Sequence, residues 1–335
     1  MKVYAIVAVW GNTKDNHAGM YYLAKRLKEA FGNKFVVVPT PTKGSRFIHG
    51  IYRLYNYLIG LWLSIVLRRN DKVFLMEYLL SETEQSDIAR MSHKKCSVRG
   101  IAHLVPARLD KEYTHDQMLQ RIGYLDRLYV LGSSLKQHFV RKGVSSEKIS
   151  VTYHYVDTDY YRPANPPLAD SKISVICMGN MERDYDTLLQ IVTNCPTIRF
   201  IICKGSAPFP DIFNSLPNVE LHGFMPEDKL RHLMQQSNIS LNVMHDTIGS
   251  NVITTSLACG LAVVASNVGS ISDYITDGTD GLLFDNTSEC IKALQRLASD
   301  TELLQSMQTN ARVKAEQISL QNFIKWFDRE FFQVK

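Results

Sequence analysis

The sequence predicts an α/β protein built from two doubly wound, Rossmann-like domains. Apolar runs of strand length alternate with amphipathic helical segments along the chain, as in parallel sheets covered by helices. The alternation is interrupted at residues 161–167, where three of seven residues are proline, and then restarts. The length of 335 residues is roughly twice that of an ordinary domain. We therefore expect one domain over 1–162 and a second over 168–318.

The first half contains six predicted strands and three predicted helices. Short apolar runs rich in β-branched residues predict strands over 3–10, 35–39, 72–76, 97–103, 127–131 and 149–153. Apolar residues at helical spacing predict helices over 19–31, 51–67 and 133–142. In the first of these helices, Leu23, Leu27 and Phe31 share one face.

The second half repeats the pattern. Strands are predicted over 172–178, 199–203, 219–222, 239–244, 262–265 and 281–284. Helices are predicted over 186–193, 227–236, 251–259, 288–298, 301–317 and 320–332. Ligands of such sheets bind beyond the carboxyl ends of the strands, and we expect the two domains to face each other across the binding cleft.

Composition excludes several classes of protein. Hydrophobic residues make up 45% and charged residues 21% of the chain, as in globular proteins and unlike disordered or collagen-like chains. Six cysteines lie scattered without CxxC or zinc spacing, which favours a reduced, intracellular protein without a structural metal. Residues 3–10 fit a buried strand better than a signal peptide, and the longest apolar run, 58–67, is too short for a bilayer.

Charge is distributed unevenly along the chain. Residues 1–160 hold 24 Lys and Arg against 14 Asp and Glu, whereas residues 161–335 hold 14 against 19. A basic half suits an anionic lipid surface or a phosphorylated acceptor, and no nucleic-acid-binding module is visible. Residues 46–69 combine four arginines with tyrosine and tryptophan. This segment either lies on an anionic membrane, lines an acceptor groove, or is a core helix with a basic face.

The loop before residue 251 has the chemistry of a phosphate site. A strand is followed by a polar, glycine-containing loop and then by a helix start. The first turn of a helix offers free N–H groups to an anion. The candidate substrate-binding residues here are Gly249, Ser250, Asn251, Thr254 and Thr255. The alternative is that Ser250 or Asn251 only caps the helix.

Loops after other strands supply further candidates. Gly179 permits a tight turn, and Arg183 can bind a phosphate with two parallel hydrogen bonds, unless it only pairs with Asp186. Lys204 follows the next strand as a second cation. In the first half, Gly19 lets a substrate approach the backbone.

Histidines and paired aspartates complete the candidates. His103 ends a strand, where it can contact a sugar hydroxyl or move a proton, and His17 precedes a helix start. The alternative for His103 is a partly buried, hydrogen-bonded histidine. Asp-x-Asp triplets at 157–159 and 184–186 can hold a divalent metal, but such short patterns arise often by chance, and we expect no metal.

Three stretches resemble retaining GT-B glycosyltransferases of the family 4 type. LDRLYVLGSS at 125–134 is similar to the family's aD-x-v-x-v-S, and ISVTYHYVDTDYYRP at 149–163 to kI-x-V-i-p-n-G-V-D-t-x-x-F-x-P. ACGLAVVAS at 258–266, followed by DGTDGLLF at 277–284, is similar to A-C-G-x-P-V-V-a-s and d-G-x-n-G-l-l. The resemblance covers most of the chain and is clearest over residues 123–285.

The resemblance implies two facing Rossmann-like domains and no metal requirement. It places the nucleotide-sugar in the C-terminal domain and the acceptor in the N-terminal domain. It also implies that the last helix, over 319–335, crosses back to the first domain. His103 and the loop from His17 to Gly19 would then face the reacting sugar.

The sequence departs from the family at its E-x7-E pair. Thr247 and Thr255 stand where the family has its two glutamates. Asp246 neighbours the first position and is, with His103, our candidate catalytic residue. Asp273 matches a later glutamate, and Arg183 is the best remaining cation of the phosphate clamp.

We therefore expect a cytoplasmic glycosyltransferase, peripheral at most at the inner face of the membrane. It would move a sugar from a nucleoside diphosphate sugar to a glycan or lipid-linked acceptor. Two alternatives remain open at this stage. One is a non-catalytic GT-B protein that binds a nucleotide or glycan, and the other is a nucleotide-sugar epimerase.

Overall fold

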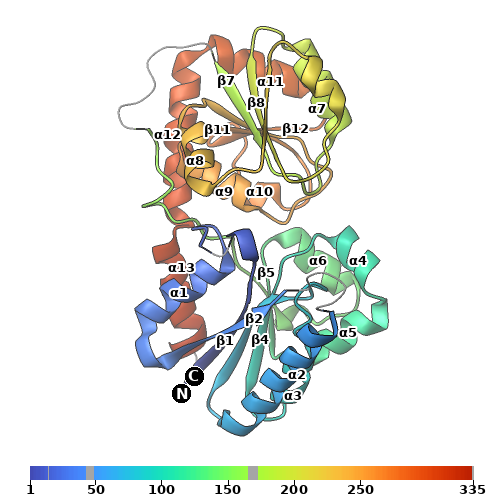
Figure 1. Cartoon of the computed structure of the whole chain (residues 1–335). Coiled ribbons are helices and arrows are strands. Elements are labelled where there is room, and N and C mark those ends of the chain that lie inside the picture. The colour runs from blue at the N-terminus through green and yellow to red at the C-terminus, as the bar shows by residue number, and fades with distance from the viewer. Residues whose placement is uncertain (14, 43–48, 165–172, 334–335) are drawn as a thin grey trace. The chain divides into compact units, whose positions relative to one another are not determined.

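The computed structural model describes residues 1–13, 15–42, 49–164 and 173–333 (Figure 1). Contacts between residues divide the chain into two units. Unit 1 comprises Met1–Tyr153 together with the C-terminal segment from Phe323, and unit 2 comprises His154–Asn322. Part of the predicted linker at 161–167, and Arg46 of the basic segment, lie outside the described residues.

Unit 1 contains a six-stranded parallel sheet in the order β2-β1-β3-β4-β5-β6. Its strands are β1 (Val3–Val9), β2 (Phe35–Pro41), β3 (Lys72–Tyr78), β4 (Ser97–Ala102), β5 (Arg127–Val130) and β6 (Ile149–Val151). Pro39 and Pro41 lie in β2, which is an edge strand and so tolerates residues without an N–H. The sequence pattern predicted all six strands to within a few residues.

Helices cover this sheet. They are α1 (Met20–Phe31), α2 (His49–Val66), α3 (Ser86–Ser92), α4 (Pro106–Glu112), α5 (His115–Gly123) and α6 (Ser133–Arg141). The sequence pattern did not predict α3, α4 or α5. These helices have seven to nine residues, and α4 buries only Leu109. Such short helices show too little apolar periodicity to be recognised.

The C-terminal helix crosses into unit 1, as predicted. It consists of α13 (Leu320–Asp328) and a π-helical segment, Arg329–Gln333. The rings of Phe327 and Phe331 stack with their centroids 4.0 Å apart, and the ring of Phe74 on β3 lies 4.9 Å from that of Phe331. Lys72 Nζ donates to the carbonyl oxygen of Phe331 at 2.5 Å. Aromatic packing and this cation therefore hold the terminal segment on the sheet.

Unit 2 contains a second six-stranded parallel sheet, in the order β12-β11-β10-β7-β8-β9. Its strands are β7 (Ser174–Met178), β8 (Arg199–Gly205), β9 (Val219–Gly223), β10 (Ile239–Asn242), β11 (Ala262–Ser266) and β12 (Gly281–Phe284). Its helices are α7 (Tyr185–Asn194), α8 (Glu227–Gln235), α9 (Asn251–Ala258), α10 (Ile271–Tyr274), α11 (Thr287–Ser299) and α12 (Thr301–Gln317). Two Rossmann-like α/β units are therefore present, as the sequence predicts.

Each sheet has a point where its strand order reverses. In unit 2 the chain builds β7, β8 and β9 in one direction, then returns to place β10 beside β7 and continues outward to β12. In unit 1 the corresponding neighbours are β1 and β3. Loops leaving the two strands at such a point diverge and leave a crevice, which is where ligands of open α/β sheets bind.

Candidate functional site

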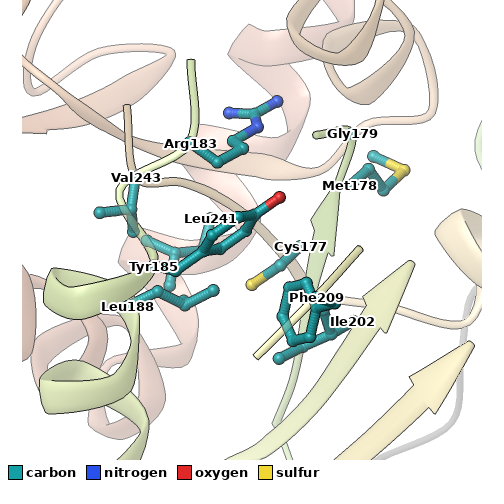
Figure 2. A pocket seen from close by; sticks show the side chains of 10 residues that line it. All are labelled: Cys177, Met178, Gly179, Arg183, Tyr185, Leu188, Ile202, Phe209, Leu241 and Val243. Atoms are coloured by element: carbon teal, nitrogen blue, oxygen red, sulfur yellow. The ribbon is translucent and has the colours of Figure 1, made fainter. Parts of the chain in front are cut away.

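The crevice of unit 2 lies between the loops that follow β7 and β10. The β7 loop begins at Gly179, whose φ of +80° is readily adopted only by glycine. A Cβ atom at Gly179 would lie 3.1 Å from Arg183 Nη2 and 3.3 Å from Val252 Cγ2. The guanidinium of Arg183 and Val252 in the first turn of α9 therefore both lie close to Gly179, where a side chain would crowd them. Figure 2 shows Arg183 and Gly179 on the same side of the pocket.

Arg183 is held by contacts of its backbone and side chain, but not all of its N–H donors have partners among the described residues. Its backbone forms an antiparallel bridge with Met244, which follows β10. Its Nη1 donates to Asn242 Oδ1 at 3.4 Å, whereas its buried Nε has no hydrogen-bond partner among the described residues. Burial lowers the pKa of Arg183 to about 10, so the group is still a cation at neutral pH. A cation with an unsatisfied donor is suited to bind an anion.

Asn242 belongs to a buried polar cluster that the sequence analysis missed. It lies on β10, fully buried, and its Nδ2 donates to Ser240 Oγ at 3.1 Å. Ser240 Oγ in turn lies 2.8 Å from Ser256 Oγ on α9. The cluster thus joins the strand beneath Arg183 to the neighbouring helix. The signal available in the sequence was the presence of two polar residues inside the apolar run 239–244.

The first turn of α9 lies beside this crevice, because Val252 is adjacent to Gly179. Ser250 caps the helix, because its Oγ accepts from the backbone N–H of Ile253 at 3.4 Å. The N–H groups of Asn251 and Val252 belong to the first turn, which has no intrahelical acceptors. The helix dipole adds positive potential at this end. Together with Arg183, this turn has the donors and the charge that suit a phosphate group, and its use as a phosphate site stays a prediction.

The turn that leads into α9 is tightly built. Thr247 Oγ1 accepts from the N–H of Gly249 at 3.1 Å, and Asp246 Oδ1 accepts from the N–H of Thr247 at 2.7 Å. Gly249 has a φ of +90°, and a Cβ there would lie 2.2 Å from the ring of Tyr274. The predicted residues Asp246 and Gly249 therefore share one turn, which is held by hydrogen bonds from backbone N–H groups to side-chain oxygens.

Four other predicted residues of unit 2 lie on α9, on α10 and near the end of β8. The hydroxyls of Thr254 and Thr255 both donate to the carbonyl oxygen of Asn251, and both side chains are buried. Lys204 is half-buried at the end of β8, and Asp273 is exposed on α10. Roles for these four residues in binding a ligand stay predictions.

A small pocket lies under the guanidinium of Arg183 (Figure 2). It is lined by Cys177, Met178, Gly179, Arg183, Tyr185, Leu188, Ile202, Phe209, Leu241 and Val243. Its enclosed space is about 20 Å³, which holds one water molecule. Burial raises the pKa of the Cys177 thiol to about 12, so that sulfur is neutral and unsuited to be a nucleophile. The pocket therefore buries the stem of Arg183 rather than a substrate.

The predicted residues of unit 1 follow β1 and β4. His103 Nε2 donates to the carbonyl oxygen of Met76 at 2.7 Å, and burial lowers the pKa of His103 to about 4. The imidazole is therefore neutral at physiological pH. The ring of His17 packs on that of Tyr22 with centroids 4.5 Å apart. Gly19 begins α1, where a Cβ would lie 3.1 Å from the carbonyl oxygen of Asn16.

Glu77 is a second residue that the sequence analysis missed. It lies at the end of β3, beside β1, and so at the reversal point of unit 1. Its carboxylate accepts from the N–H of Ala8 and from the indole N–H of Trp10, both at 2.6 Å. Burial raises the pKa of Glu77 to about 7. A lone carboxylate within the apolar run 72–78 was the signal in the sequence.

The aspartate triplets serve as turn and helix caps. Asp157 Oδ1 accepts from the N–H groups of Asp159 and Tyr160. Asp184 caps α7 by accepting from the N–H of Thr187 at 3.0 Å. Within residues 1–13, 15–42, 49–164 and 173–333, no group of three or more His, Cys, Asp or Glu is arranged to hold a metal.

In the described part of the chain, no helix combines the length and the apolar character needed to cross a bilayer.

Sequence comparison links unit 2 to a known family. Residues 172–300 match the family described as Glycosyl transferases group 1. The GPI3 subunit of phosphatidylinositol N-acetylglucosaminyltransferase from Saccharomyces cerevisiae is 22% identical over 170 residues, which are 45% of this chain and 38% of the relative. Alpha-maltose-1-phosphate synthase of Mycolicibacterium smegmatis is 22% identical over 186 residues, 47% of this chain and 48% of the relative. The chain spans less than half the length of these relatives.

Solved structures match over the whole chain. HepE of Anabaena, determined in complex with UDP, has a TM-score of 0.75 at 13% identity and covers 100% of both chains. Sucrose-phosphate synthase of Thermosynechococcus elongatus has a TM-score of 0.77 at 13% identity and covers 99% of both chains. At these identities the likeness concerns the fold. Residues 172–300 therefore resemble the Glycosyl transferases group 1 family, within a chain that has the fold of the GT-B glycosyltransferases.

Proposed function

We propose that the protein transfers a sugar from a nucleoside diphosphate sugar to a glycan or lipid-linked acceptor. The observation that carries the proposal is the pairing of Arg183 with the first turn of α9 at the reversal point of unit 2. Arg183 brings a cation with a buried Nε that has no partner among the described residues, and Asn251 and Val252 bring backbone donors. Three donors on rigid elements suit the charge of a diphosphate.

The same groups would assist the departure of the leaving diphosphate. Negative charge grows on the phosphate oxygen as its bond to the sugar breaks. Donors that are already oriented stabilise this charge without reorganising. The buried cluster of Asn242, Ser240 and Ser256 orients Arg183 and α9 in this way. Asp246, in the turn before α9, would lie near the sugar, and His103 would act as a neutral hydrogen-bonding group rather than an acid.

We propose that the reaction needs no metal and retains the configuration of the sugar. The cationic charge that a metal would supply is provided here by Arg183 and the helix dipole. We place the protein in the cytoplasm, at the inner face of the membrane, with a glycan or lipid-linked acceptor bound by unit 1. Support for a nucleotide donor comes from the UDP complex of HepE, and support for a lipid-linked acceptor from the name of the Saccharomyces relative.

A thermal-shift panel with UDP, GDP, ADP, CMP and their sugar conjugates tests the donor, first without and then with a divalent metal. A ligand at 100 times its dissociation constant stabilises a protein by about 2.7 kcal/mol. We expect one nucleotide to shift the melting temperature without metal, and its sugar conjugate to be consumed once an acceptor is supplied. A shift that requires metal would contradict the metal-independent mechanism. No shift with any nucleotide would contradict the proposal as a whole.

A non-catalytic nucleotide-binding protein is the second candidate, because two carboxylates are replaced by threonines. Thr247 accepts from Gly249 within its own turn, and Thr255 donates to its own helix. Under this alternative, nucleotide-sugar binding persists and no acceptor in a broad set receives sugar. Under our proposal, transfer occurs, and Thr255→Ala changes the affinity for the sugar conjugate while Ser299→Ala, at the end of α11, does not. Epimerisation of the donor without an acceptor would favour the third candidate, a nucleotide-sugar epimerase.

A further inference from the structure

The helix α2 has two apolar faces, of which only one is buried. One face packs toward the sheet and α3 through Tyr52, Ile59 and Leu63, all of which are buried. The remaining surface of the helix carries seven large apolar residues in the pattern i, i+3, i+4, i+7, i+10, i+11, i+14, and one of them, Trp62, also packs its ring edge-on against Tyr4 of β1. We call this set the α2 stripe, and it consists of Ile51, Leu54, Tyr55, Leu58, Leu61, Trp62 and Ile65.

The α2 stripe is exposed along its whole length. Each member has at least 40% of its surface accessible, and Ile65 reaches 82%. Fourteen residues of helix rise about 21 Å, so the stripe is a continuous apolar strip rather than scattered side chains. Figure 1 shows α2 on the outside of unit 1, alongside α3. A helix that is apolar all round is normally buried or in contact with lipid.

Positive charge lies on α2 and at its C-terminal end. No Asp or Glu occurs in the sequence between Glu29 and Asp71. Arg53 is exposed on the helix, and Arg68 and Arg69 are exposed just after it. Lys95 Nζ donates to the carbonyl oxygen of Ser64, which places another cation at the C-terminal end of α2.

Three acidic groups near α2 are engaged by other partners, and a fourth, Glu82, accepts from the hydroxyl of Ser81. Asp71 is buried and accepts from the backbone N–H groups of Lys2 and Arg68. Glu84 pairs with Arg121 at 3.4 Å, and Asp87 pairs with Arg90 at 3.0 Å. An apolar strip flanked by exposed arginines complements a surface that is apolar inside and anionic outside.

We propose that the α2 stripe docks unit 1 on an anionic lipid bilayer, with α2 lying in the plane of the interface. The apolar side chains would enter the boundary between headgroups and acyl chains, and the arginines would contact lipid phosphates. Tyr55 and Trp62 suit this boundary, because each joins an apolar ring to one polar atom. The proposal concerns unit 1 alone and stands whether or not the protein transfers a sugar.

Vesicle co-sedimentation of the full chain tests the proposal, with vesicles of phosphatidylcholine alone or mixed with phosphatidylglycerol. We expect binding to the anionic vesicles, weakened by salt. Leu58→Ser with Ile65→Ser should lower the partition coefficient at least about tenfold. The reason is that this variant replaces two apolar side chains, which would be buried in lipid, by polar ones. Arg68→Gln with Arg69→Gln should lower it by about tenfold on anionic vesicles only. The matched control is Ile212→Ser with Val313→Ser, which alters two residues of unit 2 that are also at least half exposed.

Three results would overturn the proposal. The first is a wild-type chain that does not sediment with anionic vesicles, and the second is equal binding by the stripe variant and the control. The third is a dimer in the absence of lipid that the stripe variant dissociates, which would assign the stripe to contact between two copies. Tryptophan fluorescence during urea unfolding of the same variants serves as the folding control, since all three tryptophans lie in unit 1 with α2.

Discussion

The reversal points of the two sheets differ in charge. In unit 2, β7 and β10 are followed by Arg183 and by the positive end of α9. In unit 1, the corresponding strands β1 and β3 are bridged by the buried carboxyl of Glu77. A phosphate approaching the first point meets a cation and free N–H groups, whereas at the second it meets a carboxyl whose acceptors already bind β1. The same topology is thus equipped for an anion in only one of the two units.

The donors at the two points are also used differently. In unit 1, the donors nearest the reversal point, the N–H of Ala8 and the indole of Trp10, are consumed by Glu77. In unit 2, Arg183 Nε remains without a partner among the described residues. The carboxyl of Glu77 therefore engages the donors of one crevice internally, whereas Arg183 keeps an unsatisfied donor at the other. Substitutions in each unit test this contrast.

The largest effect is expected at Gly249, in the turn that precedes α9. Gly249→Ala should lower the free energy of unfolding by about 4 kcal/mol, because it combines a positive φ with a Cβ 2.2 Å from the Tyr274 ring. Gly278→Ala is the matched control, since its φ is +73° but its Cβ would meet no atom within 4 Å. It should cost about 1 kcal/mol. Urea unfolding followed by circular dichroism measures both, and equal losses would contradict the tight construction of this turn.

The second effect concerns Glu77 and the pH dependence of unit 1. Its pKa is raised to about 7 from 4.5, so the folded state binds the proton more tightly than the unfolded state. The stability it contributes is present below pH 4.5 and is lost as the pH rises to 7, up to about 3 kcal/mol. All three tryptophans lie in unit 1, so tryptophan fluorescence during urea unfolding reports that unit.

Glu77→Gln removes the titrating group and should flatten this pH dependence between pH 5 and 7. The matched control is Glu29→Gln, an exposed residue of α1 in the same unit. A wild-type chain whose unit 1 is equally stable at pH 5 and pH 7 would contradict the assignment of a neutral, buried carboxyl to this reversal point.

A smaller effect is expected from Asn242→Leu. Its hydrogen bond to Arg183 is long, at 3.4 Å, so its loss should weaken binding of the preferred nucleoside diphosphate only about threefold. Titration calorimetry measures the change, with Ser174→Ala at the opposite end of the neighbouring strand as the control. Unchanged affinity in Asn242→Leu would show that Arg183 is oriented by its backbone bridge to Met244 alone.

The strands and long helices were predictable because burial on both faces of a parallel sheet leaves continuous apolar runs, as in Val3–Val9. The short helices α3, α4 and α5 were not, since each presents only one to three buried residues. Exact ends were also missed where local bonds decide them. Strand β10, for example, ends at Asn242 rather than at residue 244, because the next residues turn to pair with 182–184.

The site was predicted in part. Arg183 and the residues from Gly249 to Asn251 were predictable because a cation, a glycine and helix-capping residues follow predicted strands. The structure brings Arg183 and the start of α9 together at Gly179. Glu77 and Asn242 did not stand out, although each is a polar residue in an apolar strand. Their contacts depend on which strands are neighbours, and the local sequence of either segment does not predict the order of strands in the sheet.

The most direct test of the central claim compares two ligands on two variants. Titration calorimetry would measure the affinity of the preferred nucleoside diphosphate and of its nucleoside, for the wild-type chain, Arg183→Ala and Arg199→Ala. Arg199 is the control. It is an exposed arginine at the N-terminal end of β8, and it pairs with Glu220. We predict that Arg183→Ala weakens the diphosphate about 30-fold, the equivalent of about 2 kcal/mol, and leaves the nucleoside unchanged. Equal loss for both ligands, or no loss for the diphosphate, would contradict a phosphate site at the reversal point of unit 2.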